Sequence, residues 1–479
     1  MEEKNLIFTL SGIQGIIGKD LNFNIAKKIS IAFGLWLNSK EKKVIISKDT
    51  RPSGKVLEKA VIEGLIGTGN KVVNLRICPT PITIYTKNKY NIPGGIIITG
   101  SHNPQEWNGL KLLSLNNFVN KNDLEQISNI INKIDIKFYP PKKRVKHKQI
   151  EILNPIPEYI QDLYKFVDQK RVKKKNNLRV VIDTGAGTGK FATPKILEGM
   201  GCEVKLLNND LLLNNLFPRE IEPIEKNLSD LRMEVWQGDY DIGFAHDSDA
   251  DRLAIIGENG VCYPEDISLA LITDYYLRND RYPDAEKIFV TNLASSLRFD
   301  VIVEKYNAKI IRTPVGERFL SEKMTELIEK QNMSSKTKII FGGEGSCGGF
   351  MYPNFNNTRD AIFAATKIIE ILVKTNKPVS ELVFNLPKFH SCRKKIIIKD
   401  KRINSIIDNL KNELIEEGEQ VEQIGLDLRF GKGKEWFVLI HPSNTEPIIR
   451  IISEAKRESL ARVYCEATTE LVKLIISKM

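Results

Sequence analysis

Short runs of β-branched residues alternate along the chain with stretches in which apolar residues recur every three or four positions. In the first third, the runs at 42–49, 71–77 and 94–99 predict strands, and 54–70 predicts a helix that ends at glycine. The same succession returns twice, with strands predicted from 178, at 202–207, at 241–246, at 287–293, at 308–313 and at 338–345, and helices at 191–201 and 295–307. This order predicts three α/β domains whose mixed or mostly parallel sheets are covered by helices.

The pattern changes from about residue 389. The runs 394–399, 436–442 and 448–455 predict strands, and 403–418 and 458–478 predict helices. This arrangement is typical of an α+β domain with an antiparallel sheet. We therefore expect four domains, at 1–150, 151–260, 261–380 and 381–479, with the polar and basic segment 140–177 as the best candidate for a linker.

Composition narrows the possible classes of protein. The 479 residues are 42% hydrophobic and 27% charged, and we find no apolar run long enough to span a bilayer and no secretory signal. The six cysteines are scattered without a CxxC pair, which argues against disulfides or zinc and favours the cytoplasm. The net charge of +11 comes from dispersed lysines, and the basic clusters lack interleaved aromatic residues, so we do not expect nucleic acid as a partner.

Three carboxylates stand at alternate positions in HDSDADRLAI, where Asp247, Asp249 and Asp251 follow a predicted strand. Their mutual repulsion requires a cation, and hard oxygen ligands in a cramped loop suit Mg²⁺. A calcium-binding EF-hand loop is the rival interpretation, because Glu258 stands at the twelfth place of such a loop. Its sixth place is Arg252 where that loop needs glycine, and strands flank it, so we favour Mg²⁺.

Four further motifs offer candidate chemistry. TGSHNP places Ser101 beside His102 at the end of a predicted buried strand, which makes Ser101 a candidate nucleophile. Glu344 and Ser346 in FGGEGSCGG could bind sugar hydroxyls, and the turn in HPSNTEPIIR could cradle a phosphate with Ser443, Asn444, Thr445 and Arg450. Each of these two is also compatible with an ordinary turn. GAGTG at 185–189 departs from the dinucleotide-binding GxGxxG pattern, so it gives little support for such a cofactor.

The conjunction of motifs is more specific than any one of them. TGSHNP, DSDADR, GGEGS and PSNTEP occur in this order, one in each predicted domain, and in this the chain resembles the α-D-phosphohexomutase family. The stretches SGIQG, KDTRPSG, NGLK, TPVGE and SEA extend the resemblance over nearly the whole chain. It implies four domains around a central cleft, with one of these loops from each.

The resemblance also implies a role for each matched residue. Ser101 would carry the phosphoryl group and bind Mg²⁺ together with the three aspartates, and Lys111 would act as acid or base at the reacting hydroxyl. His102 and Arg252 would lie against the phosphoryl group, and Gln14 and Arg51 would support the site. The implied substrate-binding residues are Thr313, Gly316, Glu344, Ser346, His441, Ser443, Asn444, Thr445 and Arg450.

The expected activity is therefore that of an isomerase-class phosphotransferase. It would interconvert hexose 6-phosphate and hexose 1-phosphate through a phosphoserine and a hexose 1,6-bisphosphate, in a monomer or homodimer, with no membrane partner. SGIQGIIG and GGEGS favour phosphoglucosamine mutase over phosphoglucomutase or phosphomannomutase. Gln14 and His441 stand where the family usually has arginine, and Gly348 where many members have histidine. These departures keep open a second hypothesis, a catalytically weakened protein that binds phosphosugars.

Overall fold

The computed structural model describes residues 7–9, 12–37, 42–115, 117–139, 149–175, 177–278, 285–332, 338–345, 348–398, 403–443 and 448–478. The chain divides into two compact units that do not follow chain order. The first unit comprises 1–272 and 347–383, and the second comprises 273–346 and 384–479. Within the described ranges, no helix combines the length and the apolar character that crossing a bilayer requires.

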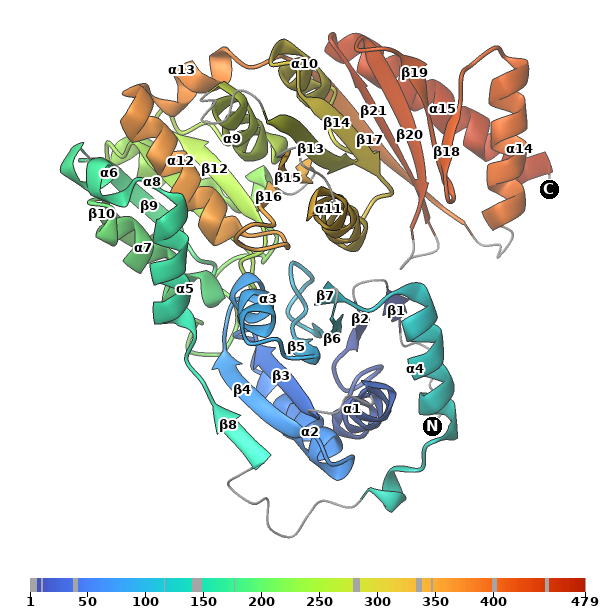
Figure 1. Cartoon of the computed structure of the whole chain (residues 1–479). Helices are drawn as coiled ribbons and strands as arrows, with labels where there is room; N and C mark the ends of the chain where they lie inside the picture. The colour runs from blue at the N-terminus through green and yellow to red at the C-terminus, as the bar shows by residue number, and fades with distance from the viewer. Residues whose placement is uncertain are drawn as a thin grey trace. The chain divides into compact units, whose positions relative to one another are not determined.

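The first sheet has eight strands in the order β1-β2-β6-β5-β3-β4-β8, with β7 paired to β6 (Figure 1). Its strands are β1 (Ile7–Thr9), β2 (Gly12–Ile16), β3 (Lys43–Lys48), β4 (Lys71–Ile77), β5 (Gly94–Ile98), β6 (Trp107–Ser114), β7 (Asn117–Phe118) and β8 (Ile150–Ile152). β3 pairs in parallel with β4 and β5, whereas β6 runs antiparallel to β2 and β5. The sheet is therefore mixed, and its parallel centre matches the predicted strand–helix–strand pattern.

Helices cover both faces of this sheet, and they are α1 (Phe23–Leu37), α2 (Gly54–Gly67), α3 (Thr80–Lys89) and α4 (Lys121–Lys133). Side chains alternate across a strand, so Ile96 and Ile98 enter the large core that α1, α2 and α4 share. Ile97 enters a smaller core with Ile84 of α3. β5 is buried on both faces, which explains its unbroken apolar sequence.

The second sheet, also in the first unit, has the order β10-β9-β11-β12. Its strands are β9 (Arg179–Asp183), β10 (Glu203–Leu207), β11 (Ile242–His246) and β12 (Leu253–Gly257). β9 pairs in parallel with β10 and β11, and β12 runs antiparallel to β11. The six residues between β11 and β12 therefore form a tight connection at one edge of the sheet.

The remaining elements of the first unit come from two separate segments of the chain. The candidate linker forms β8, α5 and α6 within its described residues, 149–175 and 177, and its role between two domains stays a prediction. α12 follows the third sheet in the chain, yet it packs against α6, α7 and β12, and its Phe363 contacts Phe166 and Phe355. The elements are α5 (Ile156–Leu163), α6 (Gln169–Lys175), α7 (Thr193–Gly199), α8 (Ser229–Gln237), β16 (Gly349–Met351) and α12 (Ala361–Thr375), with α9 (Asp266–Arg278) and α13 (Val379–Phe384) at the unit boundaries.

The second unit contains a parallel sheet and an antiparallel sheet. In the parallel sheet β13 lies between β14 and β15, and in the antiparallel sheet the order is β17-β21-β20-β19-β18. The elements are β13 (Glu286–Asn292), α10 (Arg298–Lys305), β14 (Lys309–Thr313), α11 (Glu317–Asn332), β15 (Lys338–Glu344), β17 (His390–Ile397), α14 (Ile403–Glu416), β18 (Glu422–Ile424), β19 (Asp427–Lys432), β20 (Trp436–Pro442), β21 (Ile448–Ala455) and α15 (Glu458–Lys478). The fold class is confirmed, and sequence analysis missed β18 and β19. The central cleft and the boundaries at 150, 260 and 380 stay predictions.

Candidate active site

Ser101 occupies a strained position directly after β5. Its φ of 47° lies in the left-handed region, which residues other than glycine rarely adopt. Three contacts hold it there: its backbone N–H donates to Thr99 Oγ1 at 2.8 Å, and its carbonyl accepts from Arg51 Nη2 and Ser248 Oγ, both at 2.8 Å. The side chain is directed toward Asp247, and Ser101 Oγ donates to Asp247 Oδ2 at 3.1 Å.

Arg51 holds the loop that follows Ser101. Besides the Ser101 carbonyl, its guanidinium donates to the backbone carbonyls of Asn103 at 2.6 Å, Pro104 at 2.7 Å and Trp107 at 2.9 Å. Its Nε donates to Asp49 at 3.1 Å, and both side chains are inaccessible to solvent. A Cβ on Gly100 would lie 2.6 Å from Arg51 Cζ, so only glycine allows the guanidinium this close to the loop. Arg51 thus anchors the backbone of this loop, and its role in supporting the site stays a prediction.

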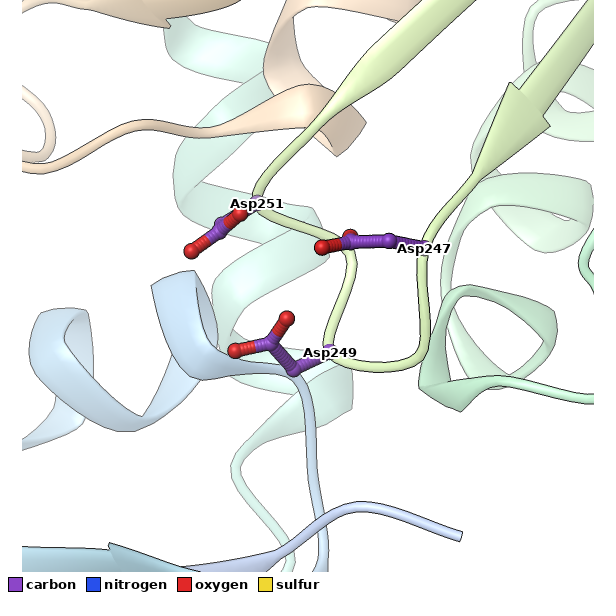
Figure 2. Close-up of side chains that lie close together, drawn as sticks. All are labelled: Asp247, Asp249 and Asp251. Carbon is purple, nitrogen blue, oxygen red and sulfur yellow. The ribbon is translucent and has the colours of Figure 1, made fainter. Parts of the chain in front are cut away.

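Asp247, Asp249 and Asp251 lie together in the β11–β12 connection, where Figure 2 shows their side chains close together and projecting to the same side of the chain. One oxygen from each lies within 4.8 Å of the others, and all three residues are buried. Ala250 adopts φ of 57°, which turns the chain sharply between the second and third aspartates. The structure therefore brings together the three residues that the sequence nominated as metal ligands.

Cations and hydroxyls from three other elements face the carboxylates. Lys111 Nζ of β6 donates to Asp249 at 2.7 Å and to Asp251 at 3.1 Å, and Arg359 donates to Asp251 at 2.8 Å. Thr80, the first residue of α3, donates to Asp249 at 2.6 Å. The second oxygens of Asp249 and Asp251 are buried and have no hydrogen-bond partner in the described parts of the chain. Because unpaired buried carboxylate oxygens are rare and suit a hard cation, the site fits Mg²⁺.

The aspartates differ in how easily they ionise. Burial and the charges of Asp249 and Asp251 raise the pKa of Asp247 well above its usual range. Burial would also raise the pKa of Asp251, but the charges of Arg359 and Lys111 outweigh it and hold that pKa below the usual range. A cation bound at the triad would favour the charged form of Asp247 as well.

His102 lies beside Ser101, and Arg252 lies beside His102. His102 Nδ1 is 3.4 Å from Ser101 Oγ, and its Nε2 is 3.4 Å from Arg252 Nη2. Burial and then the charge of Arg252 lower the pKa of His102 well below its ordinary value, so the imidazole is neutral at physiological pH. Arg252 also donates to Glu222 at 3.1 Å. Gln14 on β2 accepts from Asn103 at 2.9 Å, so it contacts the Ser101 loop through a neutral amide.

In the second unit, three polar residues end the strands β13, β14 and β15 of the four-stranded third sheet. Asn292, Thr313 and Glu344 are the last residues of β13, β14 and β15, so the carboxyl edge of the sheet brings them together. Asn292 Nδ2 donates to Glu344 Oε1 at 3.0 Å, and Glu344 and Thr313 are buried. Gly316 follows with φ of 132°, a conformation that favours glycine.

His441 and Arg450 are directly opposite each other on β20 and β21, so their side chains share one face of the antiparallel sheet. His441 Nδ1 lies 2.6 Å from Asp427 Oδ1 of β19, and Asp427 Oδ2 accepts from the backbone N–H of Val315 at 3.4 Å. The Ser443 backbone N–H donates to the Ile448 carbonyl at 2.9 Å. The predicted site residues Ser346, Asn444 and Thr445 lie outside the described residues.

Sequence reasoning missed several residues of these sites. Asp49 is two residues before Arg51, and this short spacing was an available signal. Ser248 lies between two predicted ligands, but a serine there has no motif of its own. Arg359 gave no signal, because it reaches the triad only through the packing of distant segments. The missed residues with contacts at the two sites are Asp49, Thr80, Glu222, Ser248, Asn292, Arg359 and Asp427.

Comparison with known proteins matches consecutive parts of the chain to one set of domain families. The families described as phosphoglucomutase/phosphomannomutase, alpha/beta/alpha domains I, II and III match residues 5–137, 157–260 and 264–389. The phosphoglucomutase/phosphomannomutase of Thermococcus kodakarensis is 34% identical over 475 residues, which cover 98% of each chain. The phosphoglucosamine mutase of Methanocaldococcus jannaschii is 32% identical over 479 residues, which cover 98% of this chain and 99% of that one.

The fold also matches solved structures. A phosphoglucomutase/phosphomannomutase family protein from Burkholderia thailandensis has a TM-score of 0.78 at 23% identity. The superposition covers 98% of this chain and 97% of that chain. The two proteins therefore share their architecture over nearly their full length.

Proposed function

Because this chain belongs to the α-D-phosphohexomutase family, an isomerase class of phosphotransferases, we propose that it interconverts a hexose 6-phosphate and the corresponding hexose 1-phosphate with Mg²⁺. The observation that carries the proposal is the 3.1 Å contact between Ser101 Oγ and Asp247, the first residue of a buried carboxylate triad. A phosphate on Ser101 would lie beside that triad. A cation held by the three carboxylates would neutralise the charge of such a phosphate, whereas the unmodified serine hydroxyl carries no charge to neutralise.

The first unit supplies the residues for the transfer itself. When Ser101 bears the phosphoryl group, its Oγ–phosphorus bond breaks as an oxygen of the sugar forms the new bond. The Lys111 ammonium gives a proton to the departing Ser101 Oγ, and the resulting amine takes the proton of the sugar hydroxyl, so that Lys111 ends as an ammonium again. Mg²⁺ held by Asp247, Asp249 and Asp251 supplies charge neutralisation for the phosphoryl oxygens. Arg252 adds a fixed positive charge, and neutral His102 offers a hydrogen bond. The resulting hexose 1,6-bisphosphate returns its other phosphate to Ser101 by the reverse steps.

The second unit supplies groups for recognition. We assign Glu344, held by Asn292, to the sugar hydroxyls, because an ionised carboxylate accepts from two neighbouring hydroxyls. Thr313, Gly316 and Ser346 complete this group. His441, Ser443 and Arg450, with Asn444 and Thr445, are assigned to the phosphate that does not react. Binding energy from that distant phosphate would serve orientation at the reacting end.

Glucosamine phosphate is the preferred substrate in this proposal. The M. jannaschii relative named phosphoglucosamine mutase supports this choice, and the T. kodakarensis relative named phosphoglucomutase/phosphomannomutase supports the alternative. The candidate sugars differ at one substituent, which Glu344 could contact in each case.

A catalytically weakened phosphosugar-binding protein is the second candidate. Gln14 favours it, because its amide brings no positive charge to the Ser101 loop. The buried triad with its unpaired carboxylate oxygens favours the active enzyme, since a binding protein would gain nothing from that electrostatic cost.

Coupled assays of the purified protein with the 1-phosphates of glucosamine, glucose and mannose, with Mg²⁺ and a trace of the matching 1,6-bisphosphate, test these candidates. We expect turnover of all three, fastest with glucosamine 1-phosphate, and a phosphate on the peptide that contains Ser101 by mass spectrometry. Saturable binding of hexose phosphates without turnover would favour the binding protein. Unchanged turnover in Ser101→Ala would overturn the assignment of the phosphoryl carrier.

A further inference from the structure

Ser248 stands between two of the metal-site aspartates but contributes no ligand to the triad. Its side chain turns the other way, toward the loop of Ser101, and it is fully buried. We propose that Ser248, acting with Asp49, is a positioning residue that sets where Ser101 lies relative to the metal-binding loop. The inference rests on the proposed function and deepens it.

The Ser248 hydroxyl makes two contacts across the boundary between the first and second sheets. Ser248 Oγ lies 2.8 Å from the carbonyl oxygen of Ser101 and 3.0 Å from Asp49 Oδ2. A hydroxyl has one hydrogen, so the two acceptors share it. The contact with the Ser101 carbonyl is a direct link between the residue that carries phosphate and the loop that holds the metal.

Asp49 makes this link rigid. Its carboxylate is inaccessible to solvent and accepts from Thr99 Oγ1 at 2.7 Å, from Arg51 Nε at 3.1 Å and from the Arg51 backbone N–H at 3.0 Å. Thr99 and Arg51 are the two residues whose side chains also bond the Ser101 backbone. One buried carboxylate therefore joins Ser248 to both supports of the left-handed Ser101 conformation.

Ser248 is equally well fixed on its own side. Its carbonyl accepts from the Thr188 backbone N–H at 2.8 Å and from Thr188 Oγ1 at 3.1 Å. A Cβ on Gly187 would lie 2.7 Å from the Asp247 carbonyl, so the two loops of the second sheet are in close contact. The Ser248 backbone thus belongs to the second sheet, and its hydroxyl transmits that position to the first.

Removing the hydroxyl should disturb the geometry of transfer without removing the metal. The triad has independent anchors, because Lys111 of β6 and Thr80 of α3 contact Asp249 directly. A displacement of about 1 Å between reacting groups can cost roughly 10²-fold in rate. We therefore expect Ser248→Ala to lower kcat about 10- to 100-fold, with KM and the Mg²⁺ concentration for half-activation within about twofold of the native values.

The experiment compares four proteins of full length: native, Ser248→Ala, Asp49→Asn and the double variant. Ser47→Ala is the matched control, because Ser47 is a buried serine of the same unit whose hydroxyl bonds Thr83 at 2.8 Å, away from the Ser101 loop. Steady-state kinetics and the transfer of phosphate from hexose 1,6-bisphosphate to Ser101, followed by intact mass, are measured for each. Because both single changes break the same link, the double variant should lose no more activity than Asp49→Asn alone.

Several results would overturn the proposal. One is a fall in kcat for Ser248→Ala that is no larger than the fall for Ser47→Ala. Another is a double variant whose fold-loss in kcat equals the product of the two single fold-losses, since the two residues would then act independently. A rise in KM that accounts for the whole effect would place Ser248 in ground-state binding instead. If Asp49→Asn fails to fold, the comparison of Ser248→Ala with its control Ser47→Ala still tests the proposal. A native protein that neither turns over hexose phosphates nor takes up phosphate would overturn the proposed function itself, whereas the results above leave that function standing.

Discussion

The residues that we assign to phosphoryl transfer, in the first unit, and those that we assign to substrate recognition, in the second, are held in different ways. Around Ser101 and the triad, side chains of opposite charge form buried ion pairs. Asp49 pairs with Arg51, and Asp251 pairs with Lys111 and Arg359. In the second unit, Glu344 accepts from the neutral amide of Asn292, and strand register places His441 opposite Arg450. This difference indicates that changes in the first region should reduce turnover or stability, whereas changes in the second should mainly weaken substrate binding.

The largest effect should come from the metal triad. Asp249→Asn removes the charge of a proposed metal ligand while keeping the shape of the side chain. We expect turnover to fall by roughly 10²-fold or more, because replacing even a residue that only hydrogen-bonds to a metal ligand typically costs about 10- to 100-fold in metal affinity or activity. Steady-state assays over a range of Mg²⁺ concentrations measure the change, with Asp230→Asn on the exposed face of α8 as control. Native turnover at low Mg²⁺ would show that the metal binds elsewhere, and stronger activation by Ca²⁺ would revive the EF-hand hypothesis.

The next effect should be on stability. Arg51→Met leaves Asp49 as a buried carboxylate without its cation. We expect the free energy of unfolding to fall by about 3–5 kcal/mol, and calorimetry should show this as a lower Tm. Adding Asp49→Asn should restore part of that Tm, because the unpaired charge is then gone. Arg457→Met, at an exposed position, should change little. No difference between Arg51→Met and Arg457→Met would mean that the Asp49–Arg51 pair does not stabilise the Ser101 loop.

A smaller effect, on binding alone, should follow a change in the second region. His441→Gln keeps a donor for Asp427 but removes the group that can carry positive charge, so we expect KM for the hexose phosphate to rise about tenfold while kcat stays within about twofold. His390→Gln on β17, an exposed histidine of the same unit, is the control. Equal kinetics for the two variants would remove His441 from the phosphate site, and a fall in kcat alone would contradict the division between the two regions.

The smallest effect concerns a buried charge with few partners. Lys87 of α3 is buried, its ammonium donates to the Leu115 carbonyl, and burial lowers its pKa to about 8. The unfolded chain therefore binds more protons than the folded one as pH rises above 8, so Lys87 destabilises the fold less at higher pH. The stability advantage of Lys87→Met should shrink by about 1 kcal/mol between pH 8 and pH 9.

Calorimetric Tm values at several pH values measure this trend. Lys121→Met, at an exposed position on α4, provides the baseline for the titration of other groups. An advantage that is constant between pH 7 and 9 would show that the pKa of Lys87 is not lowered and that its ammonium stays charged in the folded protein over this range. The results for Arg51 and Lys87 would then no longer distinguish a buried charge that is paired, as in Asp49–Arg51, from a buried charge with few partners.

Much of this arrangement could be predicted from sequence because it is local. Strand β5 is an unbroken apolar run, and the loops that carry Ser101 and Asp247 come directly after predicted strands, where α/β folds place their sites. The alternate spacing of the three aspartates makes the metal site recognisable from the order of residues alone.

What could not be predicted depends on contacts between distant segments. Asp427 reaches His441 because β19 and β20 pair, and β19 itself was missed because its short apolar alternation ends at Gly431. Arg359 reaches Asp251 only because the segment 347–383 groups with the first unit, although its strand β16 belongs to the third sheet. The periodicity of apolar residues does not predict which of two sheets a segment packs against.

The interrupted first unit has a consequence for how the chain is made. Synthesis proceeds from the N-terminus, and Arg359 is added 108 residues after Asp251, once the ribosome has completed the stretch 273–346 that belongs to the other unit. Until then the three aspartates lack one of the cations that face them in the finished protein. A growing chain therefore holds this cluster of carboxylates incompletely compensated while the next 108 residues are added, and free Mg²⁺ in the surrounding solution is available to it throughout that interval.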